Sequence, residues 1–230
     1  MKILAMDTSS AIATVAVGDE NKILGEYTVA GERAHSQIIM PMLEELLSRC
    51  NISINDIDVF AVALGPGSFT GLRIGIAAMK TFAKSLNKKI IGVSSLDEVA
   101  ANFTLEDKFI CPIFDARRCD VYNAVYKNGE KIVSDRICNI DTVLLEMADK
   151  EVIFAGDAAI KYKEKILSAN NPKWQIAPIH LTSQSASSLI YIAQKRAENG
   201  DYDDDDILPI YIRPSQAERE YMEIHGENSL

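Results

Sequence analysis

Short apolar runs separated by turn residues open the chain. Residues 2–7 (K-I-L-A-M-D), 12–17 (I-A-T-V-A-V) and 23–29 (I-L-G-E-Y-T-V) are joined by T-S-S-A and G-D-E-N-K. Runs of this length that end at turn residues predict strands. We therefore expect residues 2–29 to form an antiparallel three-stranded meander.

From Ser36 onward the spacing of apolar residues becomes helical. Apolar side chains recur at Ile39, Met42, Leu43, Leu46, Leu47 and Cys50. Intervals of three and four predict an amphipathic helix. Residues 58–64 (D-V-F-A-V-A-L) then predict a buried strand, a glycine-rich segment follows, and residues 72–86 predict a second helix.

The second half of the chain repeats this order. It contains another predicted meander at 109–115, 119–126 and 131–138, a strand with a glycine loop at 151–158, and helical runs at 161–167 and 189–197. A repeat of whole supersecondary units indicates a duplicated architecture. The fold class we expect is α/β, with two lobes that each contain a mixed sheet.

Charge and composition narrow the functional classes. The 230 residues are 47% hydrophobic and 25% charged, with a formal net charge of −9. This composition is typical of a globular protein, and the negative charge opposes unaided binding of nucleic acid. After Met1, the N-terminus reaches Asp7 over one basic and four apolar residues. That run is too short for a signal peptide or a spanning helix, so we expect a cytoplasmic protein that does not bind membranes.

Cysteine and histidine show no metal-binding pattern. Cys50, Cys111, Cys119 and Cys138 form no C-x-x-C pair, and the three histidines form no H-x-x-x-H pair. We expect small, reduced cysteine side chains and no metal site in this chain.

Asp7-Thr8-Ser9-Ser10 ends the first strand and allows two interpretations. An acid followed by hydroxyls can hold a hydrated cation and bind phosphate. The alternative is a turn whose side chains bond to its own backbone N–H groups. The repeated turn, Asp115-Ala116-Arg117-Arg118, keeps the acid but lacks the hydroxyls, so a symmetric phosphate clamp is not expected.

The glycine-rich segment at 64–75, L-G-P-G-S-F-T-G-L-R-I-G, allows three interpretations. It lacks the lysine and terminal hydroxyl of a P-loop, and its glycines do not match the dinucleotide spacing. Gly67-Ser68-Phe69-Thr70-Gly71 does not match G-x-S-x-G either. Close packing of the backbone is the interpretation that remains.

The helix at 72–86 is apolar on more than one side. Gly75, Ile76, Met79, Phe82, Ala83 and Leu86 form one arc, and a basic stripe of Arg73, Lys80 and Lys84 borders it. A second face carries the small or apolar residues Ile74, Ala77, Ala78, Thr81 and Ser85. The first helix is also broadly apolar, with Ile38, Met42 and Leu46 in its arc. These extra faces predict a protein interface, unless other segments of the chain cover them.

Five segments together carry a family resemblance. They are M-D-T-S at 6–9, A-H-S at 34–36, G-P-G-S-F-T-G-L-R-I-G at 65–75, D-A-R-R at 115–118 and P-I-Y-I-R-P at 209–214. In this order they resemble the TsaB (YeaZ) family over nearly the whole chain. The resemblance implies an ASKHA (actin-like ATPase) fold of two ribonuclease-H-like lobes with mixed five-stranded sheets. We assign residues 1–104 to the N-terminal lobe and 105–230 to the C-terminal lobe.

The resemblance also implies a role in forming N6-threonylcarbamoyladenosine at position 37 of tRNAs that read codons beginning with A. In that family the paralogous TsaD binds the metal through a histidine pair after its glycine segment and performs the transfer. Residues 90–100, I-I-G-V-S-S-L-D-E-V-A, lack this pair. We therefore expect an accessory subunit with no catalytic residues.

The resemblance further implies the partners. A TsaD-like paralogue would bind the two N-lobe helices, and the expected interface residues are Ile38, Met42, Leu46, Arg73, Ile74, Ala77, Ala78, Thr81 and Ser85. A TsaE-like ATPase would join the heterodimer, a TsaC-type enzyme would supply the adenylate, and tRNA would bind only through the complex. A homodimer through the same face is an alternative for the isolated chain. We expect no cofactor in this chain alone, with ATP or ADP and a metal in the partner subunits.

Two other functions remain alternatives to this scaffold role. A residual nucleotide contact would use Asp7, Thr8, Ser9 and Ser10. A peptidase would need a nucleophile, but Ser68 has no recognisable base and Cys50 lies within a predicted helix.

Overall fold

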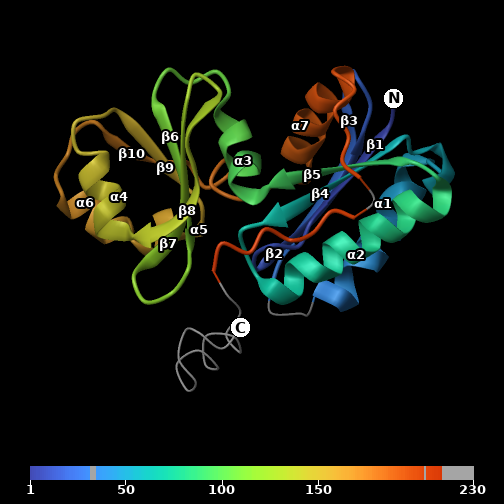
Figure 1. Ribbon diagram of the computed structural model, residues 1–230, viewed down its shortest axis with the longest axis horizontal. Helices are drawn as coiled ribbons and strands as arrows, with labels where there is room; N and C mark the ends of the chain where they lie inside the picture. Colours follow the sequence, from blue (N-terminus) through green and yellow to red (C-terminus); the bar gives the residue numbers. More distant parts are fainter. Residues whose placement is uncertain (32–34, 205, 214–230) are drawn as a thin grey trace.

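The computed structural model describes residues 1–31, 35–204 and 206–213. Figure 1 shows two lobes side by side, each built on one sheet, with the last described residues passing from the N-terminal lobe to the C-terminal lobe. Of the helices within these residues, none is both long enough and apolar enough to cross a membrane.

The N-terminal lobe is built on a five-stranded sheet in the order β3-β2-β1-β4-β5. Its strands are β1 (Ile3–Asp7), β2 (Ile12–Gly18), β3 (Ile23–Ala30), β4 (Val59–Gly65) and β5 (Lys89–Ser94). The first three strands pair antiparallel, whereas β4 pairs parallel to β1 and β5 parallel to β4. The predicted meander and the mixed character of the sheet are confirmed.

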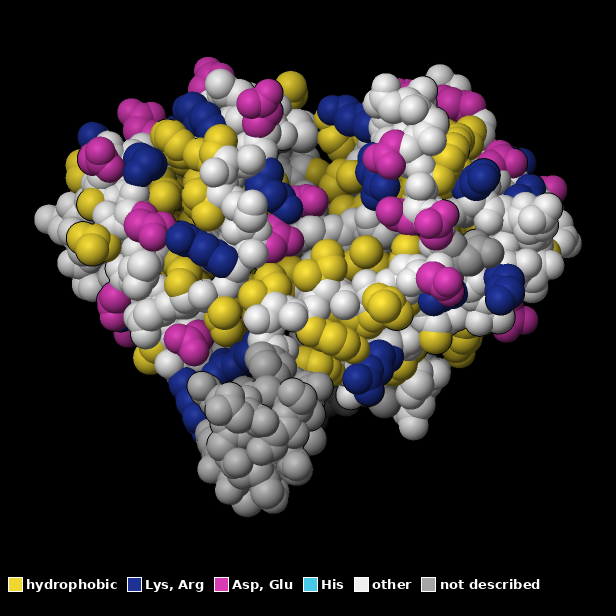
Figure 2. Space-filling view, in the orientation of Figure 1, with side chains coloured by type: hydrophobic (Ala, Val, Ile, Leu, Met, Phe, Trp, Pro, Cys, Tyr) yellow, Lys and Arg dark blue, Asp and Glu magenta, His cyan; other side chains and the backbone are white. Residues whose placement is uncertain are grey.

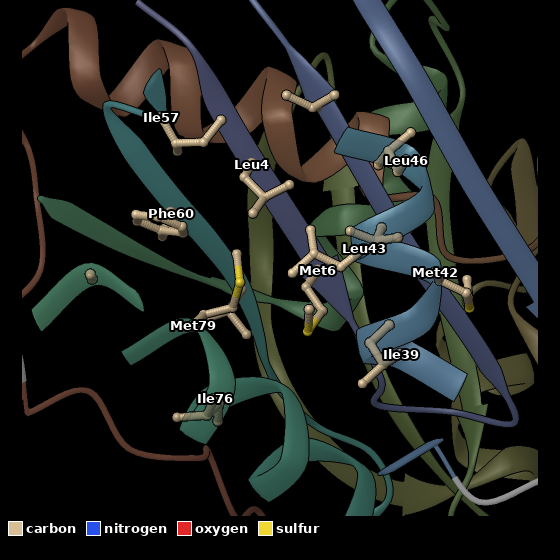
Figure 3. Close-up of a cluster of buried hydrophobic side chains, with 14 of the residues drawn as sticks. Leu4, Met6, Ile39, Met42, Leu43, Leu46, Ile57, Phe60, Ile76 and Met79 are labelled. Carbon is tan, nitrogen blue, oxygen red and sulfur yellow. The ribbon is translucent and has the colours of Figure 1, made fainter. Parts of the chain in front are cut away.

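Helices cover both faces of this sheet, because the alternating side chains of β1 divide between two cores. Leu4 and Met6 point to α1 (His35–Cys50) and α2 (Phe69–Leu86) in one apolar cluster. Ile3 and Ala5 point instead to α7 (Ala186–Glu198) in a second cluster. Figure 3 shows the first cluster, with methionine, leucine and isoleucine side chains from β1, α1 and α2 meeting over the sheet. A short 3₁₀ helix, η1 (Ile54–Asp56), precedes β4.

The C-terminal lobe repeats this topology in its own five-stranded sheet, in the order β10-β9-β6-β7-β8. Its strands are β6 (Phe109–Asp115), β7 (Asp120–Lys127), β8 (Glu130–Asn139), β9 (Val152–Ala155) and β10 (Trp174–Ile176). Helices α4 (Ile140–Glu146), α5 (Asp157–Lys161) and α6 (Lys163–Ser168) pack on one face. Helix α3 (Ser95–Ala100) and the 3₁₀ helix η2 (Ala101–Phe103) lie at the other face, towards the N-terminal lobe. The duplication predicted from sequence is confirmed.

Two boundaries differ from the expectations. Helix α7, assigned to the C-terminal lobe within residues 105–230, packs on the first sheet, because Leu189, Ile190 and Ala193 bury their side chains against β1. Helix α2 begins at Phe69 rather than Leu72, since the Ser68 side chain accepts the Gly71 N–H and caps the helix. The end of the glycine segment is therefore the first turn of a helix.

An extended segment follows α7 and crosses α2 towards the C-terminal lobe (Figure 1). We call residues 207–213 the strap. The Ile210 N–H donates to the carbonyl oxygen of Leu64 at 2.7 Å. The Arg213 guanidinium donates to the Ala116 carbonyl oxygen at 2.6 Å, so the strap contacts both lobes.

Candidate protein-interaction site

The glycine segment packs directly on the β1–β2 turn. A Cβ at Gly67 would lie 2.3 Å from the carbonyl oxygen of Ser9, and a Cβ at Gly71 would lie 1.9 Å from that of Thr8. Both distances are far below van der Waals contact, so only glycine permits this approach. Close packing is thus the confirmed interpretation of this segment, in preference to a phosphate loop or a nucleophile elbow.

Hydrogen bonds join the same elements. The Thr8 hydroxyl donates to the carbonyl oxygen of Gly71 at 2.7 Å, and the Ser68 N–H donates to that of Ser9 at 2.6 Å. The His35 Nε2–H donates to the carbonyl oxygen of Ser10 at 2.6 Å. The starts of α1 and α2 are therefore both bound to the β1–β2 turn. Of the A-H-S segment at 34–36, Ala34 lies outside the described residues.

A buried carboxyl pair lies beneath this turn. Asp7 accepts the Ser9 N–H at 2.6 Å and the Ser9 hydroxyl at 3.0 Å. The Glu98 carboxyl, from α3, is fully buried near Asp7, and neither of its oxygens has a hydrogen-bond partner among the described residues. Burial raises the pKa of Asp7, although the Ser9 N–H opposes this shift. Burial, followed by the Asp7 charge, raises the pKa of Glu98 well above its usual value, so the Glu98 carboxyl holds its proton more tightly than an exposed carboxyl does.

The hypothesis of a nucleotide contact through this turn is not supported by its burial. Asp7, Thr8 and Ser9 expose 0%, 2% and 1% of their surface, and the glycine segment covers Thr8 and Ser9. Their polar groups bond to one another and to that segment. Only Ser10 is half-buried, and its hydroxyl accepts the Ile12 N–H. The alternative interpretation, a turn bonded to its own backbone, describes these residues.

Helix α2 presents the exposed face that its sequence predicts. Arg73, Ala77, Thr81 and Ser85 are exposed, whereas Leu72 and Met79 on the opposite side are buried in the lobe. Ile74 and Ala78 are half-buried and also pack against that core. The part of α2 that is free for a partner is therefore centred on Ala77.

The burial of α1 shows that the part of the predicted interface on this helix was wrong. Met42 and Leu46 are 8% and 1% exposed, because both side chains belong to the core that α1 shares with the sheet. Ile38 is half-buried against the same core. The exposed residues of α1 are mostly polar, with Met40 and Pro41 as exceptions. The broad apolar arc of α1 is covered by its own lobe.

A groove of about 470 Å³ runs between α2 and the strap. Its lining residues are Arg73, Ile76, Ala77, Lys80, Thr81, Lys84, Ile207, Leu208 and Pro209. Figure 2 shows hydrophobic side chains running across this part of the surface. Because exposed apolar side chains seldom gather on a monomer without a function, this groove is the candidate interaction site.

The two candidate nucleophiles of the peptidase alternative, Ser68 and Cys50, make structural contacts. The Ser68 hydroxyl caps α2, and the Cys50 thiol faces the carbonyl oxygen of Leu24 at 3.6 Å. Within residues 1–31, 35–204 and 206–213, no three His, Cys, Asp or Glu side chains gather as a metal ion would require. The residues that the peptidase alternative would use therefore have structural roles.

Sequence patterns missed two parts of this region. Glu98 occupies a buried helical position between Leu96 and Val99, and an acid among apolar neighbours was the only signal for it. The segment P-I-Y-I-R-P at 209–214 overlaps the strap, but its sequence predicts no structural role, and Pro214 lies outside the described residues.

Comparisons with known proteins agree with this architecture. The family model described as tRNA N6-adenosine threonylcarbamoyltransferase (TsaD) matches residues 22–221. The tRNA threonylcarbamoyladenosine biosynthesis protein TsaB of Bacillus subtilis is 35% identical over 229 residues, which are 97% of this chain and 99% of that protein.

Solved structures extend the likeness to the fold. YeaZ from Pseudomonas aeruginosa has a TM-score of 0.76 at 25% identity, covering 91% of this chain and 99% of that one. The activator of the 2-hydroxyisocaproyl-CoA dehydratase from Clostridium difficile, with bound ADPNP, has a TM-score of 0.56 at 10% identity, covering 87% and 97%. With the two mixed sheets, these likenesses confirm the expected ASKHA fold.

Proposed function

The chain belongs to the TsaB family, and from this premise we propose that it is a non-catalytic subunit that binds and activates a TsaD-type threonylcarbamoyltransferase. The Bacillus subtilis relative is named for tRNA threonylcarbamoyladenosine biosynthesis, and we assign this chain to the same process. The product of that process would be N6-threonylcarbamoyladenosine at position 37 of tRNAs that read codons beginning with A.

The exposed face of α2 is the observation that carries this proposal. Ala77 and Thr81 are small, exposed and in the lining of the groove, so the backbone of a partner helix could approach α2 closely. The buried opposite side of α2 and the glycine contacts at Thr8 and Ser9 hold the helix rigidly on the sheet. A rigid, preformed face reduces the entropy lost on binding.

The absence of a histidine pair supports a non-catalytic role. In this chain the segment after α2 forms β5, whose Ile90, Ile91 and Val93 are buried apolar side chains. The partner would therefore supply the catalytic metal, and the partner subunits would supply ATP or ADP. A TsaE-like ATPase would join the complex, a TsaC-type enzyme would supply the adenylate, and tRNA would bind through the assembled complex.

The test is a binding measurement with purified TsaD-type protein. Ala77→Glu places a charge in the groove, and Ala77→Trp fills it without changing the charge. We expect each variant to fold normally, because Ala77 is exposed in the isolated chain. Each should bind the partner about 100-fold more weakly, which corresponds to about 2.8 kcal/mol.

Ala169→Glu is the matched control, since Ala169 is also exposed but follows α6 on the C-terminal lobe. It should bind the partner as the unmodified chain does. Normal binding by both Ala77 variants would contradict the proposal. Loss of a homodimer without loss of partner binding would assign the face to self-association instead.

A further inference from the structure

The strap exposes apolar side chains although its backbone and polar groups are held in place. Leu208 is 71% exposed, and Ile210 and Tyr211 are each 40% exposed. On the inner side, Lys80 donates from Nζ to the carbonyl oxygen of Ile207 at 3.1 Å. The strap is thus fixed to α2 while part of its apolar surface faces solvent.

Aromatic and cationic contacts fix the far end of the strap. The rings of Phe69 and Tyr211 stack with centroids 4.3 Å apart and planes 11° from parallel. Arg73 donates from Nε to the Tyr211 hydroxyl at 2.9 Å, and its guanidinium carbon lies 5.7 Å from the Tyr211 ring centroid. Both Phe69 and Arg73 belong to the first turns of α2. The glycine segment that orients α2 therefore also orients the strap.

The groove has two walls of different chemistry. Helix α2 contributes small side chains, Ala77 and Thr81, and a basic edge of Arg73, Lys80 and Lys84. The strap contributes Ile207, Leu208 and Pro209. An amphipathic helix binds such a groove by inserting apolar side chains and setting polar side chains against the rim. The basic edge favours a helix that carries carboxylates beside its apolar residues.

A second copy of this chain fits the groove less well. In a two-fold symmetric contact through α2, each copy would bring Arg73, Lys80 and Lys84 to the same interface. Like charges would then face one another across it, which disfavours that pairing. A different protein with acidic side chains meets no such repulsion.

We propose that the strap is the second wall of the docking site, and that an acidic amphipathic helix of the TsaD-type partner lies between the strap and α2. This inference rests on the proposed function and extends the interface beyond the N-lobe helices. Leu208, which lines the groove, then contacts the partner helix directly, and Ile210 borders the contact as the next exposed apolar side chain of the strap. Tyr211 and Arg73 are positioning residues that hold the strap against α2.

Partner titrations with strap variants test this inference. Leu208→Glu and Ile210→Glu should each bind purified TsaD-type protein at least tenfold more weakly, and Leu208→Ala should weaken binding by a smaller factor. Leu105→Glu is the matched control, because Leu105 is 98% exposed in a loop beside the C-terminal lobe. Circular dichroism should show that all the variants keep the fold, since the substituted side chains are exposed.

The outcomes separate this inference from the proposed function. If Ala77→Glu loses the partner while Leu208→Glu and Ile210→Glu bind within twofold of the unmodified chain, α2 docks the partner and the strap does not. That result overturns the inference alone. If Ala77→Glu also binds normally, both proposals fail. Weaker binding of the strap variants with normal binding of Leu105→Glu supports the two-walled groove.

Salt dependence tests the charge of the partner helix. Because the basic edge would pair with carboxylates, affinity for the partner should fall as ionic strength rises, and Lys84→Gln should reduce that dependence. Affinity that is indifferent to salt would contradict an acidic partner helix.

Discussion

Thr8 donates its hydroxyl proton to the carbonyl oxygen of Gly71, and its own carbonyl oxygen stands 1.9 Å from the place that a Cβ on Gly71 would occupy. The β1–β2 turn and the first turn of α2 are therefore in direct backbone contact. This contact determines where α2 begins and how its exposed face is oriented.

Gly71→Ala should destabilise the protein, because the added methyl group would collide with the backbone of Thr8. Neither backbone can move without breaking the hydrogen bonds of the turn, so we expect a loss of about 2–4 kcal/mol in the free energy of unfolding. Urea denaturation measures this loss. Gly31→Ala is the control, since a Cβ there meets no atom within 4 Å. Equal stability of the two variants would refute the account of the glycine segment.

Glu98→Gln should change how stability depends on pH. A carboxyl whose pKa is raised in the folded state binds its proton more tightly there than in the unfolded chain. Its contribution to the free energy of unfolding is therefore complete below the unfolded pKa of about 4.3. That contribution is lost as pH rises through the folded pKa. Glutamine has no such proton to lose. The variant should therefore gain stability relative to the unmodified chain as pH rises from about 5 to 8, by at most about 1.4 kcal/mol per pH unit.

Glu106→Gln is the control for that measurement, because Glu106 is exposed in a loop. The other ionisable groups that influence the pair, Glu26 and His35, are unchanged in both variants. Parallel stability curves for Glu98→Gln and the unmodified chain would show that the pair shares no proton.

Leu46→Ala separates core residues from interface residues on α1. Leu46 is 1% exposed, so its truncation should lower the free energy of unfolding by about 2–5 kcal/mol. Met40→Ala, at a position that is 42% exposed, should change stability much less. Thermal denaturation of the lone chain measures both. A Leu46 variant that stays stable but loses the partner would restore Leu46 to the interface.

The sequence was sufficient for the architecture because the duplicated order of strands and helices is visible in the apolar pattern. It was also sufficient for the exposed face of α2, where Ala77 and Thr81 lie opposite Leu72 and Met79. It failed for Met42 and Leu46, because a helical pattern gives the width of an apolar arc but not the width of the sheet that covers it. Here the arc of α1 packs against β1, β2 and α2 in one core.

Long-range contacts account for the remaining differences between the structure and the predictions from sequence. Helix α7 and the strap return to the first lobe after the whole second sheet, and no local periodicity specifies such a return. The burial of Thr8 and Ser9 likewise depends on glycines about sixty residues away. The carboxyls of Asp7 and Glu98 come from the end of β1 and from α3, and their proximity is a property of the folded lobe.

Activation of the partner is the most direct measurement of the central claim. Purified TsaD-type protein should transfer threonylcarbamoyl groups to tRNA faster when the unmodified chain or Ala169→Glu is added, and no faster when Ala77→Glu is added at the same concentration. The chain alone should transfer none. Transfer by this chain without the partner, or full activation by Ala77→Glu, would contradict the account.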